Sequence, residues 1–205
     1  KTEKSIIGNG HPTYFIADIA ANHDGSLEKA IELIHLSAEN GANAAKFQNF
    51  SAETIVSDFG FKSLGKQKSH QAAWSKPVSQ VYQEASIPIE WAPILKKECD
   101  KANIDYFTSP YEISILDYLS DYVCAWKIGS GDITWHDAIV NMAKYNLPIF
   151  LASGASTLNE VKMAVKLISE HNQNLCLMQC NTNYTASLDN FNYIELKVLK
   201  TFKKE

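Results

Sequence analysis

Ala125-Trp126-Lys127-Ile128-Gly129-Ser130-Gly131-Asp132 is the stretch that decides the fold. It begins as a short apolar strand and ends in a glycine-rich turn that carries a lysine, a serine and an aspartate. Helical spacing of apolar residues follows from Ile133 to Tyr145. A strand that delivers a cation, a hydroxyl and a carboxylate at its C-terminal end is how a βα-barrel presents an active site. The rest of the chain repeats this arrangement around one mouth.

Six such strand–helix units alternate along the 205 residues. We predict strands at 14–20, 42–48, 105–109, 125–128, 148–154 (with its turn) and 175–180, and helices at 27–38, 87–102, 115–119, 133–145, 157–168 and 191–200. Strict alternation predicts a parallel sheet with right-handed crossovers. A doubly wound sheet and a barrel both fit. The absence of G-x-G-x-x-G after the first strand weakens the Rossmann alternative, and a complete barrel needs eight units.

Local signals refine this pattern. Ser26 is a predicted N-cap, and either Ser156 or Thr157 begins the fifth helix. The nearly continuous apolar run at 14–20 predicts a strand buried on both faces, so Asp18 within it needs a partner. The polar stretch 51–81 is predicted to be irregular, as a functional or mobile loop.

Composition restricts the class of protein. A net charge of −4 gives no argument for nucleic-acid binding. Since the sequence has neither an apolar run of membrane-spanning length nor a signal-peptide core, we expect no membrane association and a cytoplasmic location. The four cysteines, Cys99, Cys124, Cys176 and Cys180, are expected to be buried free thiols.

Polar residues gather at the predicted C-terminal ends of the strands, which converge on one face in a parallel βα architecture. Two lysines, hydroxyls and glycine-rich turns suit phosphate and carboxylate oxygens, amides and a tyrosine suit sugar hydroxyls, and carboxylates can transfer protons. The set comprises Asp18, Asn22, His23, Lys46, Gln48, Thr108, Ser109, Lys127, Ser130, Asp132, Ser153, Gln179, Asn181, Asn183 and Tyr184.

Each of these residues also has a structural interpretation. The two lysines could be solvated strand ends, and Asp132 could cap the following helix. His23 is either catalytic or a loop histidine bonded to backbone. Ser130 and Ser153 could be helix caps, and the aromatic residues Trp74 and Tyr82 either close over a ligand or anchor packing. These alternatives stay open at the level of single residues.

Six short motifs, taken in order, resemble the sialic acid synthase family, the phosphoenolpyruvate-dependent N-acetylneuraminate synthases and their nonulosonate relatives. They span nearly the whole chain: Ile19-Ala20-Ala21-Asn22-His23-Asp24-Gly25-Ser26, Gly41-Ala42-Asn43-Ala44-Ala45-Lys46-Phe47-Gln48, Phe107-Thr108-Ser109-Pro110, Trp126-Lys127-Ile128-Gly129-Ser130-Gly131-Asp132, Ala152-Ser153-Gly154 and Cys180-Asn181-Thr182-Asn183-Tyr184.

The resemblance implies a TIM (β/α)8 barrel, of which this chain supplies about six βα units. The implied reaction condenses phosphoenolpyruvate with an N-acylated hexosamine, such as N-acetylmannosamine, to a nine-carbon 2-keto sugar acid with release of phosphate. Lys46, Ser109, Lys127 and Ser130 match positions that hold phosphoenolpyruvate in the family, with Thr182 or Asn183 joining them. Gln48, Asp132 and Tyr184 match positions around the sugar, and Ser153 is a further predicted substrate-binding residue.

Asp18, Asp132 and Lys127 are the predicted catalytic residues, the two carboxylates as proton handlers. Asp18 and Asp132 both stand where the family commonly has Glu. The resemblance also implies a divalent metal ion (Mn or Mg), but the family's two metal-binding histidines have no match here, so no metal ligand is predicted in this chain. Its C-terminal antifreeze-like domain likewise has no match. We therefore expect residues 1–205 to be the N-terminal part of a homodimeric synthase, inactive alone.

Two other classes of function compete with the synthase. A class I aldolase or lyase would use Lys127 as a Schiff-base nucleophile, which requires a desolvated lysine of lowered pKa. A sugar-binding or scaffold relative would need no chemistry at all. Within the synthases, legionaminate, pseudaminate and spore-coat polysaccharide proteins share most of these motifs, and the sequence does not select the amino sugar.

Overall fold

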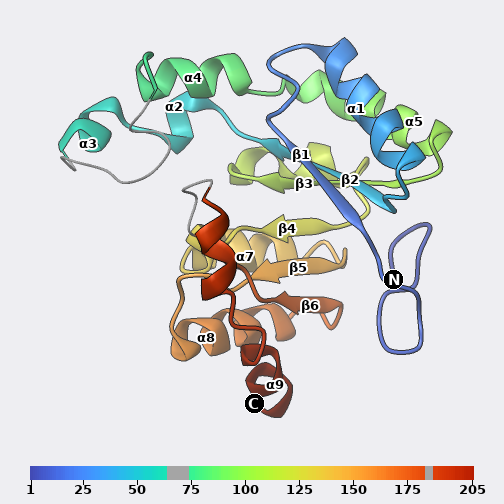
Figure 1. Ribbon diagram of the computed structural model, residues 1–205, viewed down its shortest axis with the longest axis vertical. Coiled ribbons are helices and arrows are strands. Elements are labelled where there is room, and N and C mark those ends of the chain that lie inside the picture. The colour runs from blue at the N-terminus through green and yellow to red at the C-terminus, as the bar shows by residue number, and fades with distance from the viewer. Residues whose placement is uncertain (64–73, 183–186) are drawn as a thin grey trace.

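A computed structural model describes residues 1–63, 74–182 and 187–205 of the chain. Its centre is a sheet of six parallel strands whose spatial order is their chain order. The strands are β1 (Ile16–Ala20), β2 (Ala44–Asn49), β3 (Asp105–Pro110), β4 (Trp126–Ile128), β5 (Ile149–Ala152) and β6 (Leu175–Met178). The sheet is a half-barrel, with β1 and β6 as its two edges (Figure 1). The predicted alternation and parallel sheet are confirmed.

Helices connect the strands. The α-helices are α1 (Leu27–Glu39), α2 (Ala52–Ile55), α3 (Asp58–Ser63), α4 (Val78–Ala85), α5 (Ala92–Lys101), α6 (Leu116–Ser120), α7 (His136–Ala143), α8 (Leu158–Ser169) and α9 (Val198–Lys204). Short 3₁₀ turns are η2 (Ile89–Trp91), η3 (Ile113–Ile115), η4 (Ser130–Asp132) and η5 (Leu188–Tyr193). The arrowheads of β3 to β6 point to the left in Figure 1, and α2, α3 and α4 lie on that side.

Capping residues fix where the two longest helices begin. The Ser26 side chain accepts a hydrogen bond from the Lys29 N–H at the start of α1, as predicted. Thr157, one of the two predicted starting points, caps α8 in a reciprocal capping box with Glu160. Gly41, with φ of 87°, follows the end of α1 in a conformation that favours glycine.

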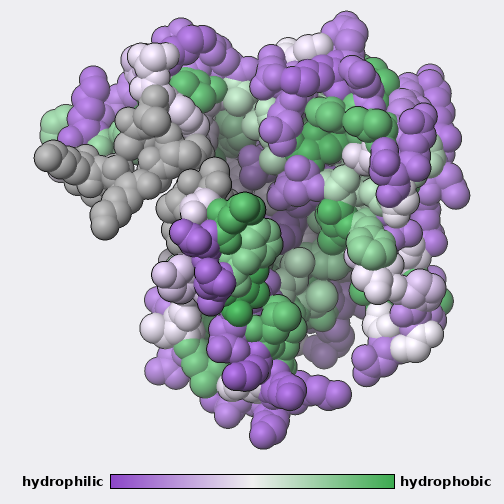
Figure 2. Space-filling model, viewed as in Figure 1, coloured by the Kyte–Doolittle hydropathy of each residue, from purple (hydrophilic) through white to green (hydrophobic). Residues whose placement is uncertain are grey.

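The core forms between the sheet and the helices that cover its convex face. Its largest fully buried side chains include Trp126, Tyr106, Phe47 and Leu95. The other face of the sheet is concave and carries a second set of rings, since Phe150 stacks on Phe107 at 5.3 Å and on Tyr14 at 6.4 Å between centroids. In Figure 2 the near face is hollowed between β1 and the C-terminal segment. These rings therefore form an apolar layer inside the half-barrel.

The N-terminal residues are fastened to the bottom of the sheet by Asp105, the first residue of β3. This carboxylate is 0% exposed and accepts hydrogen bonds from the Thr2 hydroxyl at 2.5 Å, the Tyr14 hydroxyl at 2.7 Å and the Lys4 N–H at 3.3 Å. A buried carboxylate is stabilised by several donors of this kind. The polar lead-in is thus part of the folded structure.

Three sequence predictions are wrong in detail. The stretch predicted to be irregular at 51–81 contains α2, α3 and the start of α4, while 64–73 lie outside the described residues. The helix predicted at 191–200 is instead η5 followed by α9. Asp18 is exposed, because β1 is an edge strand and its concave side has no covering layer in the described chain.

The cysteine prediction is confirmed in part. All four are free, and Cys99 and Cys124 are buried, but Cys176 is exposed and Cys180 is half-buried because β6 is the other edge of the sheet. In the described part of the chain, none of the helices has the length and apolar character needed to cross a bilayer.

Candidate active site

Lys46 and Asp18 meet on the concave face of the sheet. They are direct partners in the register of β2 and β1, so their side chains leave the same face, and the Lys46 Nζ lies 2.9 Å from the Asp18 Oδ1. The register shifts immediately afterwards, between Asp18 and Ala20, which leaves Ile19 as an extra residue. The lysine side chain is 7% exposed and the aspartate side chain 62% exposed. Lys46 is therefore a buried cation, contrary to its interpretation as a solvated strand end.

Lys127 also lies on the concave face, where the charges of Lys46 and Asp18 act on it. Its Nζ donates a hydrogen bond to the Ile128 carbonyl oxygen at 2.8 Å. Burial lowers the pKa of the Lys127 ammonium group, and the positive charge of Lys46 lowers it further, whereas Cys180, Asp18 and Asp132 oppose the shift. Strand pairing of Lys127 with Phe150 places it beside the apolar layer. The two predicted lysines are thus brought together.

Asp132 ends the glycine-rich turn after β4. Burial raises the pKa of the Asp132 carboxyl group, although the Lys127 charge and a hydrogen bond from the Gly129 backbone lower it. The side chain makes no capping hydrogen bond to α7, whose N-cap is Trp135, so the helix-cap interpretation is wrong. A Cβ placed on Gly129 would lie 2.5 Å from the Asp132 Oδ2 and 3.6 Å from the Tyr111 hydroxyl. A side chain at position 129 would therefore push the Asp132 carboxylate away from this turn.

Ser130, Gly154 and Thr182 converge from the ends of three neighbouring strands. The Gly154 N–H donates to the Ser130 Oγ at 3.0 Å. A Cβ on Gly154 would lie 2.6 Å from the Thr182 Cγ2, 2.9 Å from the Cys180 carbonyl oxygen and 2.9 Å from the Ser130 Oγ. This contact places Thr182 beside Ser130, as the resemblance implies. Thr182, Ser130 and the Gly154 backbone thus lie together at the ends of β4, β5 and β6.

The remaining predicted residues differ in availability. Ser109, 2% exposed, is the strand partner of the half-buried Gln48, so both face the same side as Lys46. Ser153 donates its hydroxyl to the Met178 carbonyl oxygen at 2.8 Å, which makes it a tie between β5 and β6. Thr108 faces the opposite way and donates to the Asn49 Oδ1 at 2.7 Å. Asn183 and Tyr184 lie outside the described residues.

His23 is a buried loop histidine bonded to backbone, which was one of its two predicted roles. It is 0% exposed, accepts the Gly25 N–H at its Nδ1 at 3.1 Å and packs edge-on against Trp91 at 5.6 Å between ring centroids. Burial lowers the pKa of the His23 imidazole. Asn22 donates its side-chain amide to the Ile19 carbonyl oxygen at 2.9 Å, so it also supports the turn.

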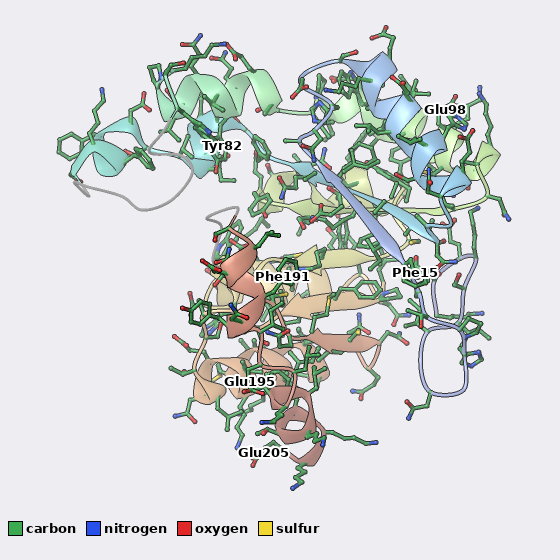
Figure 3. The ribbon with its side chains drawn as sticks, in the orientation of Figure 1. Phe15, Tyr82, Glu98, Phe191, Glu195 and Glu205 are labelled. Carbon is green, nitrogen blue, oxygen red and sulfur yellow. The ribbon has the colours of Figure 1, made fainter. Side chains whose placement is uncertain are left out.

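The aromatic residues near the mouth form a packed group. Tyr82 on α4 lies 5.3 Å from Phe50 and 6.2 Å from Trp74 between ring centroids, and Phe50 lies 6.3 Å from Tyr111. Figure 3 labels Tyr82 on α4 in the upper left of the view and Phe191 on η5 below it. The packing interpretation of Trp74 and Tyr82 therefore holds in this structure.

Sequence reasoning missed Tyr111 as part of the site, and it included Cys180 and Gly154 only as members of motifs, without a role for either. Tyr111 directly follows Pro110 at the end of β3, and Cys180 lies just beyond the end of β6. Position after a strand was the available signal for all three residues, but their contacts with Gly129, Lys127 and Ser130 are visible only in the structure.

A divalent metal ion does not fit the residues that the structure describes. Outside 64–73 and 183–186, no group of three His, Cys, Asp or Glu side chains lies close enough together to hold one. Asp18 and Asp132 are the carboxylates nearest the lysines, and both interact with Lys127. We derive no chemical step through a metal ion.

Comparisons with known proteins find relatives over most of the chain. The sequence profile of the NeuB family matches residues 33–205. The N,N'-diacetyllegionaminic acid synthase of Campylobacter jejuni is 30% identical over 195 residues, covering 93% of this chain and 57% of that protein. Human N-acetylneuraminate-9-phosphate synthase is 26% identical over 199 residues, covering 97% of this chain and 54% of that protein. The chain thus spans about half the length of the curated relatives it matches.

Solved structures support the fold independently. A sialic acid synthetase from Leptospira borgpetersenii superposes with a TM-score of 0.79 at 24% identity, covering 99% of this chain and 67% of that one. The spore coat polysaccharide biosynthesis protein spsE of Bacillus subtilis gives a TM-score of 0.71 at 25% identity, covering 91% and 49%. At 24% identity the first likeness carries the fold alone, and it supports the half-barrel of six parallel strands.

Proposed function

The chain belongs to the NeuB family, and on that premise we propose that the whole protein condenses phosphoenolpyruvate with an N-acylated hexosamine to a 2-keto sugar acid of the sialic acid type. Its relatives include synthases of N-acetylneuraminate 9-phosphate, legionaminic acid and pseudaminic acid. The six βα units described here would supply the phosphoenolpyruvate site.

The observation that carries the proposal is the pair of lysines on the concave face. Phosphoenolpyruvate has two anionic groups, a phosphate and a carboxylate, and each needs a cation or several N–H donors. Lys46 and Lys127 interact electrostatically, and Ser130, Thr182 and Ser109 provide hydroxyl groups at the neighbouring strand ends. The apolar layer of Phe107 and Phe150 beside them lowers the local dielectric, which strengthens such charge contacts.

The proposed chemistry assigns separate proton transfers to the two aspartates. C3 of phosphoenolpyruvate attacks the aldehyde carbon of the open-chain sugar, and the aldehyde oxygen takes a proton from Asp132. Burial raises the pKa of the Asp132 carboxyl group, which is the direction that a general acid requires. Water then adds to the oxocarbenium-like C2, and one of its protons passes to Asp18. The resulting C2 hydroxyl gives its proton to the departing phosphate as the C2–O(phosphate) bond breaks and the C2 carbonyl forms. Gln48 and the predicted Tyr184 would contact the sugar.

Phosphate release from phosphoenolpyruvate by the whole protein tests this proposal. The acceptors are N-acetylmannosamine, its 6-phosphate and diacetamido hexoses. We expect release to depend on one acceptor and to fall at least about 100-fold in Lys46→Met and Lys127→Met, since each loses a charge-assisted contact. The same variants should lose phosphoenolpyruvate binding in calorimetry. Binding of phosphoenolpyruvate without sugar-dependent release would instead support a non-catalytic sugar-binding relative.

One observation favours a second candidate, an aldolase or lyase that forms a Schiff base. The lowered pKa of Lys127 makes its neutral amine more accessible, as that chemistry requires. Borohydride reduction in the presence of pyruvate, followed by mass spectrometry, separates the two. A reduced pyruvate adduct that forms in wild type but not in Lys127→Arg would support the aldolase or lyase. A wild-type chain without an adduct would exclude Schiff-base chemistry with pyruvate and favour the synthase.

A further inference from the structure

We infer that Tyr111 is a positioning residue for the proposed general acid: its hydroxyl group holds the Asp132 carboxylate in place as the carboxyl group gives its proton to the sugar aldehyde. This inference rests on the proposed function and deepens it, because it adds a side chain from the end of β3 to the proton transfer assigned to the turn after β4. The step makes no covalent bond to Tyr111, so we expect this residue to change the rate of the reaction and not the binding of phosphoenolpyruvate.

The backbone of Tyr111 is fixed by the centre of the sheet. β3 ends at Pro110, the strand partner of Asn49, and the Tyr111 N–H continues the ladder by donating to the Asn49 carbonyl oxygen at 2.9 Å. Because side chains alternate along a strand, Tyr111 shares the concave face with Ser109. β3 and β4 are each paired on both sides, so this placement does not depend on the open edges of the half-barrel.

Aromatic packing supports the Tyr111 ring. The ring lies edge-on to Phe50 at 6.3 Å between centroids. Phe50, 7% exposed, packs in turn against Tyr82 on α4. Ring pairs of this kind have a preferred geometry, which restricts how the Tyr111 ring can turn. The hydroxyl end of the ring lies beside Gly129, in the turn after β4.

The Tyr111 hydroxyl and the Asp132 carboxylate approach the same point of that turn. A Cβ built on Gly129 would lie 3.6 Å from the Tyr111 hydroxyl oxygen and 2.5 Å from the Asp132 Oδ2. The two oxygens therefore flank one small volume, which Gly129 leaves free of a side chain. We expect them to form a hydrogen bond in the loaded site, reached by rotation of the side chains alone.

A hydroxyl donor at this point favours the charged form of the acid. Once Asp132 has given its proton to the aldehyde oxygen, it is a half-buried carboxylate with restricted access to water. A phenol O–H donates to such an anion, and hydrogen bonds to charged groups are stronger than those between neutral groups. The Tyr111 hydroxyl thus stabilises the carboxylate that the proton transfer produces, and it lowers the pKa of Asp132 against the effect of burial.

Removal of the phenol hydroxyl changes the pH profile in a defined direction. The titratable groups that act on this part of the site are Lys127 on β4 and, around it, Lys46 on β2, Asp18 on β1 and Cys180 after β6. All of them stay in place when only the hydroxyl is removed. Loss of the donor raises the pKa of the Asp132 carboxyl group, so the decline of kcat at high pH, where the acid has lost its proton, moves to higher pH.

Steady-state phosphate release by the whole protein, with the acceptor that supports turnover, is the test. Tyr111→Phe keeps the ring against Phe50 and removes only the hydroxyl. We expect kcat to fall about tenfold, the effect of one hydrogen bond to a charged group. The KM for phosphoenolpyruvate and its dissociation constant in calorimetry should stay within about twofold of wild type. In Asp132→Asn, which has no acid to position, the same change should lower the residual kcat by less than about twofold.

Tyr82→Phe is the matched control. It removes the hydroxyl from the other tyrosine that packs against Phe50, and it lies on α4 and not at a strand end. We expect its kcat and its pH profile to equal those of wild type.

Each outcome decides for or against the inference. A Tyr111→Phe protein with the kcat of wild type, or an equal loss in Tyr82→Phe, overturns the inference and leaves the proposed function standing. A lower kcat with weaker phosphoenolpyruvate binding, or with an unmoved pH profile, also overturns it, because the hydroxyl would then act on binding or packing. If wild type shows no acceptor-dependent phosphate release, the proposed function is wrong, and the inference with it.

Discussion

Substitution of Gly154 by alanine tests whether three strand ends meet as tightly as the structure shows. A Cβ at this position would lie within 2.6 to 2.9 Å of the Thr182 methyl, the Cys180 carbonyl oxygen and the Ser130 hydroxyl. Two of these atoms are on side chains, but the carbonyl belongs to the backbone and cannot move by rotation. The substitution must therefore displace the chain after β6 or the turn after β5.

The magnitude follows from two opposing effects. Overpacking of a tight contact costs about 1–3 kcal/mol. Alanine gains about 0.4–1 kcal/mol by restricting the unfolded chain, provided the backbone conformation is compatible. The overpacking is larger, so we expect Gly154→Ala to lower the free energy of unfolding by about 1–2 kcal/mol and the melting temperature by about 3–6 °C for a domain of this size. Displacement of Ser130 and Thr182 should also weaken phosphoenolpyruvate binding.

Thermal unfolding followed by circular dichroism measures the first effect and calorimetry the second. Gly131→Ala is the matched control, because it lies in the same region and has no atom within 4 Å of an added Cβ. We expect its melting temperature to equal or slightly exceed that of wild type. A Gly154→Ala protein as stable as Gly131→Ala would refute the close convergence of β4, β5 and β6 at this point.

Three further predictions concern stability. Asp105→Ala removes the buried acceptor of the Tyr14 hydroxyl and should lower the free energy of unfolding by about 3 kcal/mol in urea denaturation. Thr157→Ala removes the capping box with Glu160 and should cost about 1 kcal/mol by the same measurement. The folded-state pKa of His23 lies below its ordinary 6.5, so the unfolded chain binds the proton more readily; the free energy of unfolding should fall as pH drops below 6.5, and His23→Gln should flatten that dependence.

Each of these has a control on the surface. Asp189→Ala, Thr201→Ala and His11→Gln replace exposed residues of the same types and should change stability by less than about 0.5 kcal/mol. If Asp105→Ala lowered the free energy of unfolding no more than Asp189→Ala, the hydrogen bonds from the N-terminal residues to Asp105 would not stabilise the protein as described. If the free energy of unfolding kept its pH dependence in His23→Gln but lost it in His11→Gln, the responsible group would be His11 and the prediction for His23 would be wrong.

Much of the fold could be predicted because local signals agree with one another. Ser26 and Thr157 carry capping chemistry in the sequence itself, and both cap the helices predicted after them. The apolar run that ends in Lys127 and Gly129 likewise predicted β4 before a turn. The short helices α2 and α3 were missed because four to six residues are too few for an apolar period to be recognised.

Burial at the sheet edges was harder to predict. It depends on which other elements cover a strand, and the strand's own sequence does not reveal them. An apolar strand indicates two covered faces, yet Asp18 on β1 and Cys176 on β6 are exposed at the open edges of the half-barrel. The identity of the candidate site residues was accessible from strand ends. Their contacts were not, because the pairing of Asp18 with Lys46 depends on a register that only the assembled sheet defines.

The order of the strands has a consequence for how the protein is made. Each strand pairs with the one synthesised just before it, so the sheet can extend as the chain leaves the ribosome without waiting for distant partners. The longest interval between paired strands runs from Asn49 to Asp105. Closing that interval carries the largest entropic penalty of the sheet. Docking of β3 onto β2 is therefore the natural slow step of assembly, and Asp105 fastens the N-terminal residues only once that step is complete.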